Sequence, residues 1–92
     1  MQYEWDERKR RSNLLKHGLD FADTDKIDWL NSATEEDQSE RYGEARYRTI
    51  APMGSVLTVM VWTETDSGWV RVISLRKANK REIRQYYDDP KF

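Results

Sequence analysis

The sequence contains no cysteine and only one histidine, and these two shortages exclude several kinds of site. Without cysteine the chain can form no disulfide, no thiolate zinc site and no cysteine nucleophile. One imidazole cannot build an all-histidine metal site, and no stretch has the spacing of a metal-binding loop. The sequence therefore predicts no metal site and no cofactor.

Long apolar runs are also missing. No run approaches the roughly 20 apolar residues that span a membrane, and the first residues do not resemble a signal peptide. We therefore expect a soluble, cytoplasmic protein that makes no contact with membrane. At 92 residues the chain has room for one small core, so residues 1–92 are predicted to form a single domain.

Charge is abundant but unevenly distributed. The formal net charge is only −1. Residues 20–44 hold nine carboxylates against two cations, a net charge of −7, and the rest of the chain carries +6. Local charge matters more than the total when a polyanion is attracted to a surface. The basic part of the chain is therefore a candidate surface for a nucleic-acid backbone.

The pattern of apolar residues and turn signals predicts an α+β fold, a small antiparallel sheet with helices packed on it in the order β-α-α-β-β-β-α. Strands are expected over Met1–Trp5, Glu44–Ala51, Val56–Thr65 and Trp69–Arg76, and helices over Glu7–Lys16, from Asp20 to about Leu30, and after Asn79 to Tyr87. The last three strands form a meander through two hairpin turns. Val56–Thr65 is the most apolar run and is expected at the centre of the sheet.

Two of these expectations concern the acidic part of the chain. The helix from Asp20 is predicted to bury its apolar residues, which are Phe21, Ile27, Trp29 and Leu30. The polar segment Ala33–Gly43 is predicted to be a loop.

The C-terminal helix combines a cap, an apolar stripe and a basic face. Asn79 is a good N-cap, and Glu82 three residues later can reach back to the backbone N–H of the cap. The apolar stripe consists of Ile83, Tyr86 and Tyr87, and the cations at the joint and along the exposed side are Arg76, Lys77, Lys80, Arg81 and Arg84.

Arginines supply the main chemical signal. Arg46 and Arg48 lie on the first strand of the meander, and Arg71 and Arg76 lie on its last strand. A meander places these strands on either side of the middle one, so Arg46 can share a face with Arg71 or Arg76. Guanidinium groups bind phosphate through two parallel hydrogen bonds. The alternative is that several of them pair with Glu44, Glu64 and Glu82 in surface ion pairs of little energetic value.

His17 is the first candidate for proton transfer, because its ordinary pKa is about 6.5. Its alternative role is to finish the first helix, where a donor suits the last carbonyl groups. Six aromatic residues could stack on bases or fill the core, and for Trp62 we expect the core. They are Tyr42, Tyr47, Trp62, Trp69, Tyr86 and Tyr87.

Three short blocks follow one another in order over nearly the whole chain. They are Tyr3-Glu4-Trp5-Asp6 with Lys9, Asn13 and Lys16-His17-Gly18-Leu19-Asp20-Phe21, then Tyr42-Gly43-Glu44-Ala45-Arg46-Tyr47, and finally Val72-Ile73-Ser74-Leu75-Arg76-Lys77-Ala78 with Arg81-Glu82 and Tyr86-Tyr87. Together they resemble the BrnT toxin family. Leu75 stands where that family often has alanine; it faces away from Ser74 and Arg76, so we expect the difference to affect packing.

The resemblance implies a type II toxin with a RelE-like fold, a ribonuclease that inhibits translation without a metal ion. It also implies a BrnA-like ribbon-helix-helix antitoxin as partner, with DNA contacted only through that antitoxin. Carried over to this sequence, it suggests Arg46 and Arg76 on the scissile phosphate and His17 in proton transfer. Residues suggested to bind the substrate are Lys16, Arg71, Ser74, Lys77, Lys80 and Arg84, with Lys16 also a substitute for His17.

Two other functions remain open at this stage. The first is an inactive RelE-like domain that only binds its antitoxin. The second is a DNA-binding regulator, which the sequence disfavours because the second predicted helix is acidic and no helix-turn-helix pair is evident.

Overall fold

A computed structural model describes residues 1–37 and 44–88 of the chain. In chain order the elements are β1 (Tyr3–Glu4), α1 (Glu7–His17), the 3₁₀ helices η1 (Phe21–Lys26) and η2 (Trp29–Asn31), β2 (Ala33–Asp37), β3 (Arg46–Met53), β4 (Val56–Glu64), β5 (Val70–Lys77) and α2 (Lys80–Asp88). The five strands form one sheet in the order β1-β5-β4-β3-β2. All neighbours are antiparallel except β1 and β5.

This architecture confirms the predicted α+β class and the meander. β4 occupies the centre of the sheet, as its apolar sequence predicted. The β3–β4 turn is shorter than expected, because Met53 pairs with Val56 and only Gly54 and Ser55 lie between the strands. Gly54 has φ 63°, a left-handed conformation that glycine adopts without a steric penalty.

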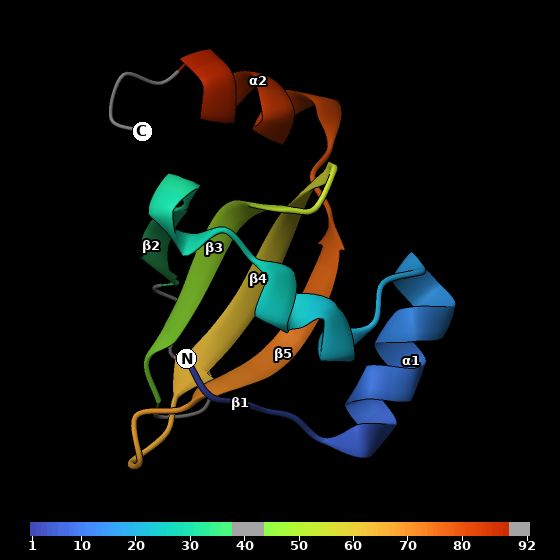
Figure 1. Ribbon diagram of the computed structural model, residues 1–92, viewed down its shortest axis with the longest axis vertical. Coiled ribbons are helices and arrows are strands. Elements are labelled where there is room, and N and C mark those ends of the chain that lie inside the picture. The colour runs from blue at the N-terminus through green and yellow to red at the C-terminus, as the bar shows by residue number, and fades with distance from the viewer. Residues whose placement is uncertain (38–43, 89–92) are drawn as a thin grey trace.

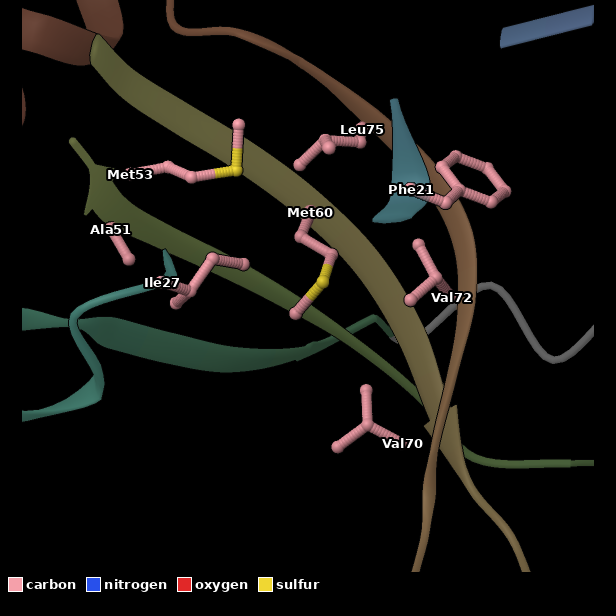
Figure 2. Close-up of a cluster of buried hydrophobic side chains, with 8 residues drawn as sticks. All are labelled: Phe21, Ile27, Ala51, Met53, Met60, Val70, Val72 and Leu75. Atoms are coloured by element: carbon pink, nitrogen blue, oxygen red, sulfur yellow. The ribbon is translucent and has the colours of Figure 1, made fainter. Parts of the chain in front are cut away.

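The core lies on one face of the sheet, under η1 and beside α1 (Figure 1). Figure 2 shows its buried side chains, which come from η1, the residue that follows η1, and strands β3 to β5: Phe21, Ile27, Ala51, Met53, Met60, Val70, Val72 and Leu75. Leu75 is fully buried here, so its volume bears on packing as the sequence predicted.

The second predicted helix is wrong in kind and extent. Residues Phe21–Lys26 form a 3₁₀ helix, and a separate turn follows at Trp29–Asn31. A 3₁₀ helix has about three residues per turn, so Phe21, Thr24 and the following Ile27 line up on one side, and all three are buried. Leu30, expected in the core, is 97% exposed. The buried residues therefore repeat every three positions, as in a 3₁₀ helix, and not every 3.6 positions, as in the predicted α-helix.

The loop predicted over Ala33–Gly43 is also wrong in its first part. Ala33–Asp37 forms the edge strand β2, which pairs with β3 along its whole length. Three acidic residues in a row are poor strand formers, but Glu35 stands opposite Arg48 and Asp37 opposite Arg46. Cross-strand pairs of opposite charge favour this pairing. The remainder of the predicted loop, residues 38–43, lies outside the described residues.

The helix α2 does not bury the apolar stripe expected of it. Its buried residue is Glu82, while Ile83 is partly exposed and Tyr87 is 72% exposed. α2 lies beyond the end of the sheet (Figure 1), where the Tyr86 hydroxyl donates a hydrogen bond to the carbonyl of Asn31. Ion pairs of Glu82 with Arg48 and Arg76 connect α2 to the sheet.

Candidate functional site

The sheet face opposite the core carries a row of cations. Side chains alternate between faces along a strand, so the residues next to the core residues in β3 and β5 point to this side. The β4–β5 pairing shifts register between Val61 and Trp62, which leaves Ile73 as an extra residue and keeps Arg71 on the same face as Ser74 and Arg76. We call the surface formed by Arg46 and Arg48 from β3 and by Arg71, Ser74 and Arg76 from β5 the arginine face. The sequence predicted that Arg46 would share a face with Arg71 or Arg76, and it shares one with both.

Arg48 and Arg76 meet on one carboxylate although they come from strands on opposite sides of β4. Arg76 binds Glu82 with both Nη atoms, at 2.7 Å to Oε1 and 2.9 Å to Oε2. Arg48 donates from Nη1 to the same Oε2 at 3.0 Å. The side chain of Glu82 is only 10% exposed, whereas those of Arg48 and Arg76 are 30% and 36% exposed. A buried carboxylate thus joins two arginines that remain open to solvent.

Glu82 also belongs to the capping box at the start of α2. The Asn79 backbone N–H donates to Glu82 Oε1 at 2.9 Å, and the Glu82 N–H donates to Asn79 Oδ1 at 2.8 Å. This is the reciprocal pair that the sequence Asn-x-x-Glu predicted. The hydrogen bonds from Arg76, together with the one from Asn79, lower the pKa of Glu82 to about 2 against the opposing effect of burial. The carboxylate is therefore charged at any physiological pH.

The other arginines of this face also have acidic neighbours. Arg48 donates from Nε and Nη2 to Glu35 Oε1, at 3.0 and 2.6 Å. Arg46 is mostly buried, and its Nη2 lies 3.8 Å from Glu44 Oε1. Arg71 is more open and lies 3.5 Å from Glu4. The ion-pair alternative therefore applies to each of these arginines. Arg71–Glu4 is a surface pair, whereas Arg46, Arg48 and Arg76 are partly buried in their pairs.

Arg71 lies at the β1 edge of the sheet, beside a shallow hollow of about 350 Å³. The hollow is lined by Glu4, Trp5, Asp6, Lys9, Arg71, Val72 and Ile73. It contains cations and carboxylates in equal number, so its field is mixed.

The remaining residues of the predicted site are more dispersed. Lys77 ends β5, and Lys80 and Arg84 lie exposed on α2. Lys16 and His17 occupy the last turn of α1, which runs beside β5 (Figure 1). α1 packs beside β5, whereas Arg46 lies on β3, on the other side of the central strand β4. The sheet thus brings Arg46, Arg71 and Arg76 onto one face, and the two candidates for proton transfer come from an element outside the sheet.

The aromatic residues divide between the core and the surface. Trp62 lies between Tyr47 and Trp29, with ring centroids 4.8 and 5.6 Å away, and its Nε1 donates to Thr49 Oγ1 at 2.8 Å. It packs against the core, as expected. Trp69 and Tyr87 are exposed. Tyr42 lies outside the described residues.

Comparison with known proteins decides the family. A family model described as the ribonuclease toxin BrnT of type II toxin-antitoxin systems matches residues 5–82. The crystal structure of the Brucella abortus ribonuclease toxin BrnT is 30% identical, with a TM-score of 0.71 over 87% of this chain and 99% of that one. This chain belongs to the BrnT family. It is therefore a ribonuclease toxin of a type II toxin–antitoxin system, as the resemblance of its three sequence blocks implied. No match appears among curated proteins.

Two residues of this candidate site were absent from the set of site residues predicted from the sequence. Arg48 was recognised on its strand but not assigned to the site, although its alternation with Arg46 places it on the same face. Glu82 was expected to cap α2 and was one of three carboxylates that could pair with the arginines. The sequence did not reveal that Glu82 binds Arg48 and Arg76 together, because Arg48 is 34 residues away from it.

Two absences hold for residues 1–37 and 44–88. No group of three or more His, Cys, Asp and Glu side chains in that part of the chain is arranged to hold a metal ion. Neither described α-helix is long and apolar enough to cross a membrane.

Proposed function

We propose that this BrnT-family toxin binds the RNA backbone on its arginine face and cleaves it without a metal ion. The observation that supports this is the pair Arg48 and Arg76, whose guanidinium groups converge on one point from separate strands. A guanidinium group matches the geometry of a phosphate, and two of them can stabilise the charge that builds up on phosphorus in the transition state.

In the proposed reaction the ribose 2′-oxygen attacks the adjacent phosphorus. The new bond joins the 2′-oxygen to phosphorus, and the bond from phosphorus to the 5′-oxygen of the next nucleotide breaks. A base takes the proton of the 2′-hydroxyl, and an acid gives a proton to the leaving 5′-oxygen. The products are a 2′,3′-cyclic phosphate and a 5′-hydroxyl, so the reaction needs no other reactant.

The roles of individual residues follow the arrangement of the face. Arg76 and Arg46 hold the scissile phosphate, and Arg48 joins them because it shares Glu82 with Arg76. The flanking backbone is held by Arg71, Ser74, Lys77, Lys80 and Arg84. His17 transfers the proton, and Lys16 replaces it if His17 does not. This last assignment rests on the match of His17 to the family motif and on the imidazole ring, which can accept and donate a proton.

The test uses the purified chain, a short RNA and EDTA to remove divalent cations. Wild type should cleave the RNA, and an RNA with a 2′-deoxyribose at the cleavage position should remain intact. Arg48→Ala and Arg76→Ala should each lower the cleavage rate about 100-fold, the usual effect of losing one donor to the transition state. Arg11→Ala, an exposed cation on α1, is the matched control and should cleave like wild type. Cleavage of the deoxy substrate, or loss of all activity in EDTA, would contradict the mechanism.

We also propose a BrnA-like ribbon-helix-helix antitoxin as the partner, with DNA bound only by that antitoxin, and the cytoplasm as the place where translation is inhibited. A type II toxin has a cognate antitoxin. The exposed Leu15, Leu30 and Tyr87 support a protein partner, because large apolar side chains open to water are typical of interaction surfaces. Coexpression with a BrnA-like ribbon-helix-helix protein should yield a stable complex that no longer cleaves RNA. A free toxin after coexpression would contradict this partner.

A further inference from the structure

We propose that Glu82 is a positioning residue for cleavage: its buried carboxylate holds Arg48 and Arg76 together in the geometry that receives the phosphate. This inference rests on the proposed function of the arginine face. It assigns to Glu82 a task beyond capping α2.

Arg48 and Arg76 carry like charges that Glu82 holds close together. Arg48 and Arg76 belong to strands separated by β4, and neighbouring strands lie about 4.8 Å apart. Two cations at short range repel each other, more so away from bulk water. Here both donate to the same oxygen, Glu82 Oε2, at 3.0 and 2.9 Å. The carboxylate therefore supplies the attraction that brings the two guanidinium groups to one point.

Among the described contacts, neither Arg48 nor Arg76 uses all of its N–H donors. A guanidinium group has five N–H donors. Arg48 uses three of them, one on Glu82 and two on Glu35, and Arg76 uses three, two on Glu82 and one on the Lys77 carbonyl. Both arginines are more exposed than the carboxylate between them. Each thus keeps donors for an anion that arrives from solvent, while Glu82 lies behind them.

Glu82 is not suited to act as the general base. A general base must be able to take a proton near the working pH. The pKa of Glu82 is lowered to about 2, first by its hydrogen bonds with Arg76. Its two oxygens already accept four hydrogen bonds, from Arg48, Arg76 and the Asn79 backbone. Glu82 therefore acts through the arginines and does not itself move the proton.

The test compares two variants that affect the same capping box. Glu82→Gln keeps a side-chain oxygen for the Asn79 N–H, because glutamine also serves in capping boxes, but it loses the charge that binds the arginines. Asn79→Ala removes the cap residue and leaves the carboxylate and both arginines in place. Circular dichroism establishes that each variant is folded at the assay temperature.

Under this proposal Glu82→Gln should lower the single-turnover cleavage rate at saturating RNA by at least about tenfold. Asn79→Ala should lower thermal stability but leave that rate within about twofold to threefold of wild type. The double variant Glu82→Gln/Arg76→Ala should lose less activity than the product of the two single losses, because the part of the Glu82 effect that acts through Arg76 is already gone and only its effect on Arg48 remains. A merely structural role would instead give effects that multiply.

Three results would overturn the inference. Glu82→Gln could cleave like wild type or faster, the latter if the carboxylate competes with phosphate for the arginines. The effects of Glu82→Gln and Arg76→Ala could multiply. Finally, Glu82→Gln could lower cleavage while Arg76→Ala does not. Only this third result also contradicts the proposed function; in the first two, a loss of activity in Arg76→Ala would leave the arginine face intact as the site.

Discussion

The side-chain amide of Asn13 makes hydrogen bonds with both backbone polar groups of Leu75. Its Nδ2 donates to the Leu75 carbonyl at 2.7 Å, and its Oδ1 accepts from the Leu75 N–H at 3.1 Å. The same Nδ2 donates to the carbonyl of Leu19 at 3.1 Å. One residue of α1 thus does for the outer edge of β5 what a neighbouring strand would do, at the position just before Arg76.

The first prediction follows from this contact. Asn13→Ala leaves the N–H and C=O of Leu75 without partners in a buried place, and each unsatisfied group costs about 1–3 kcal/mol. We expect the free energy of unfolding to fall by about 2–4 kcal/mol, measured by urea denaturation. Ser12→Ala, an exposed neighbour on the same helix, should change it by less than about 0.5 kcal/mol. Equal stability of the two variants would show that Asn13 does not secure the edge.

The second prediction concerns acid stability. The pKa of Glu82 is about 2 in the folded chain and near the ordinary 4.5 when unfolded, so its stabilising effect is complete above pH 4.5 and is lost as the pH falls towards 2. By linkage such a shift corresponds to at most about 3–3.5 kcal/mol. Wild type should exceed Glu82→Gln in unfolding free energy at pH 7, and the difference should shrink steadily below pH 4.5. A difference that does not depend on pH would contradict this.

The third prediction tests the β3–β4 turn. Gly54 has φ 63°, and an added Cβ would meet no other atom within 4 Å, so alanine there suffers backbone strain alone. A left-handed conformation costs an ordinary residue about 1–2 kcal/mol. Gly54→Ala should lower the unfolding free energy by about that amount, while Ser55→Ala, next to it in the same exposed turn, should be nearly neutral. A neutral Gly54→Ala would mean that the turn has another conformation.

The fourth prediction distinguishes the observed 3₁₀ turns from a continuous amphipathic helix. Leu30→Ser should change stability by less than about 0.5 kcal/mol, because the side chain is 97% exposed. Ile27→Ser should cost several kcal/mol, because that side chain lies in the core. Thermal melts of both variants give the comparison. A large loss with Leu30→Ser would favour the helix that the sequence suggested.

Much of the fold was accessible from sequence, because local signals agree with it. Alternating and apolar runs gave β3, β4 and β5 and their shared face. The helix predicted over Glu7–Lys16 is α1, which begins after Asp6 and ends at Gly18: the Asp6 carboxylate accepts hydrogen bonds from the backbone N–H groups of Arg8 and Lys9, and Gly18 takes the left-handed conformation. Asn79 and Glu82 likewise begin α2 with a reciprocal cap.

The missed features depend on partners distant in the sequence. Ala33–Asp37 is a strand because its carboxylates lie opposite Arg46 and Arg48, which the segment itself does not contain. Phe21–Lys26 is a 3₁₀ helix because Ile27 leaves it to form a bridge with Met53. Glu82 joins the site through two strands at once. In each case a charge or a contact on another strand or helix decides the structure, and the secondary-structure propensity of the segment itself does not.

The most direct test of the arginine face is total-RNA integrity and growth after inducing this chain alone in bacterial cells. The variants are Arg46→Ala/Arg76→Ala and, as a charge-matched control, Arg8→Ala/Arg11→Ala on the exposed side of α1. We predict growth arrest and RNA loss with wild type and with the α1 control, and normal growth and intact RNA with folded Arg46→Ala/Arg76→Ala. RNA loss that survives the Arg46/Arg76 change would contradict the arginine face as the site and direct attention to His17 and Lys16.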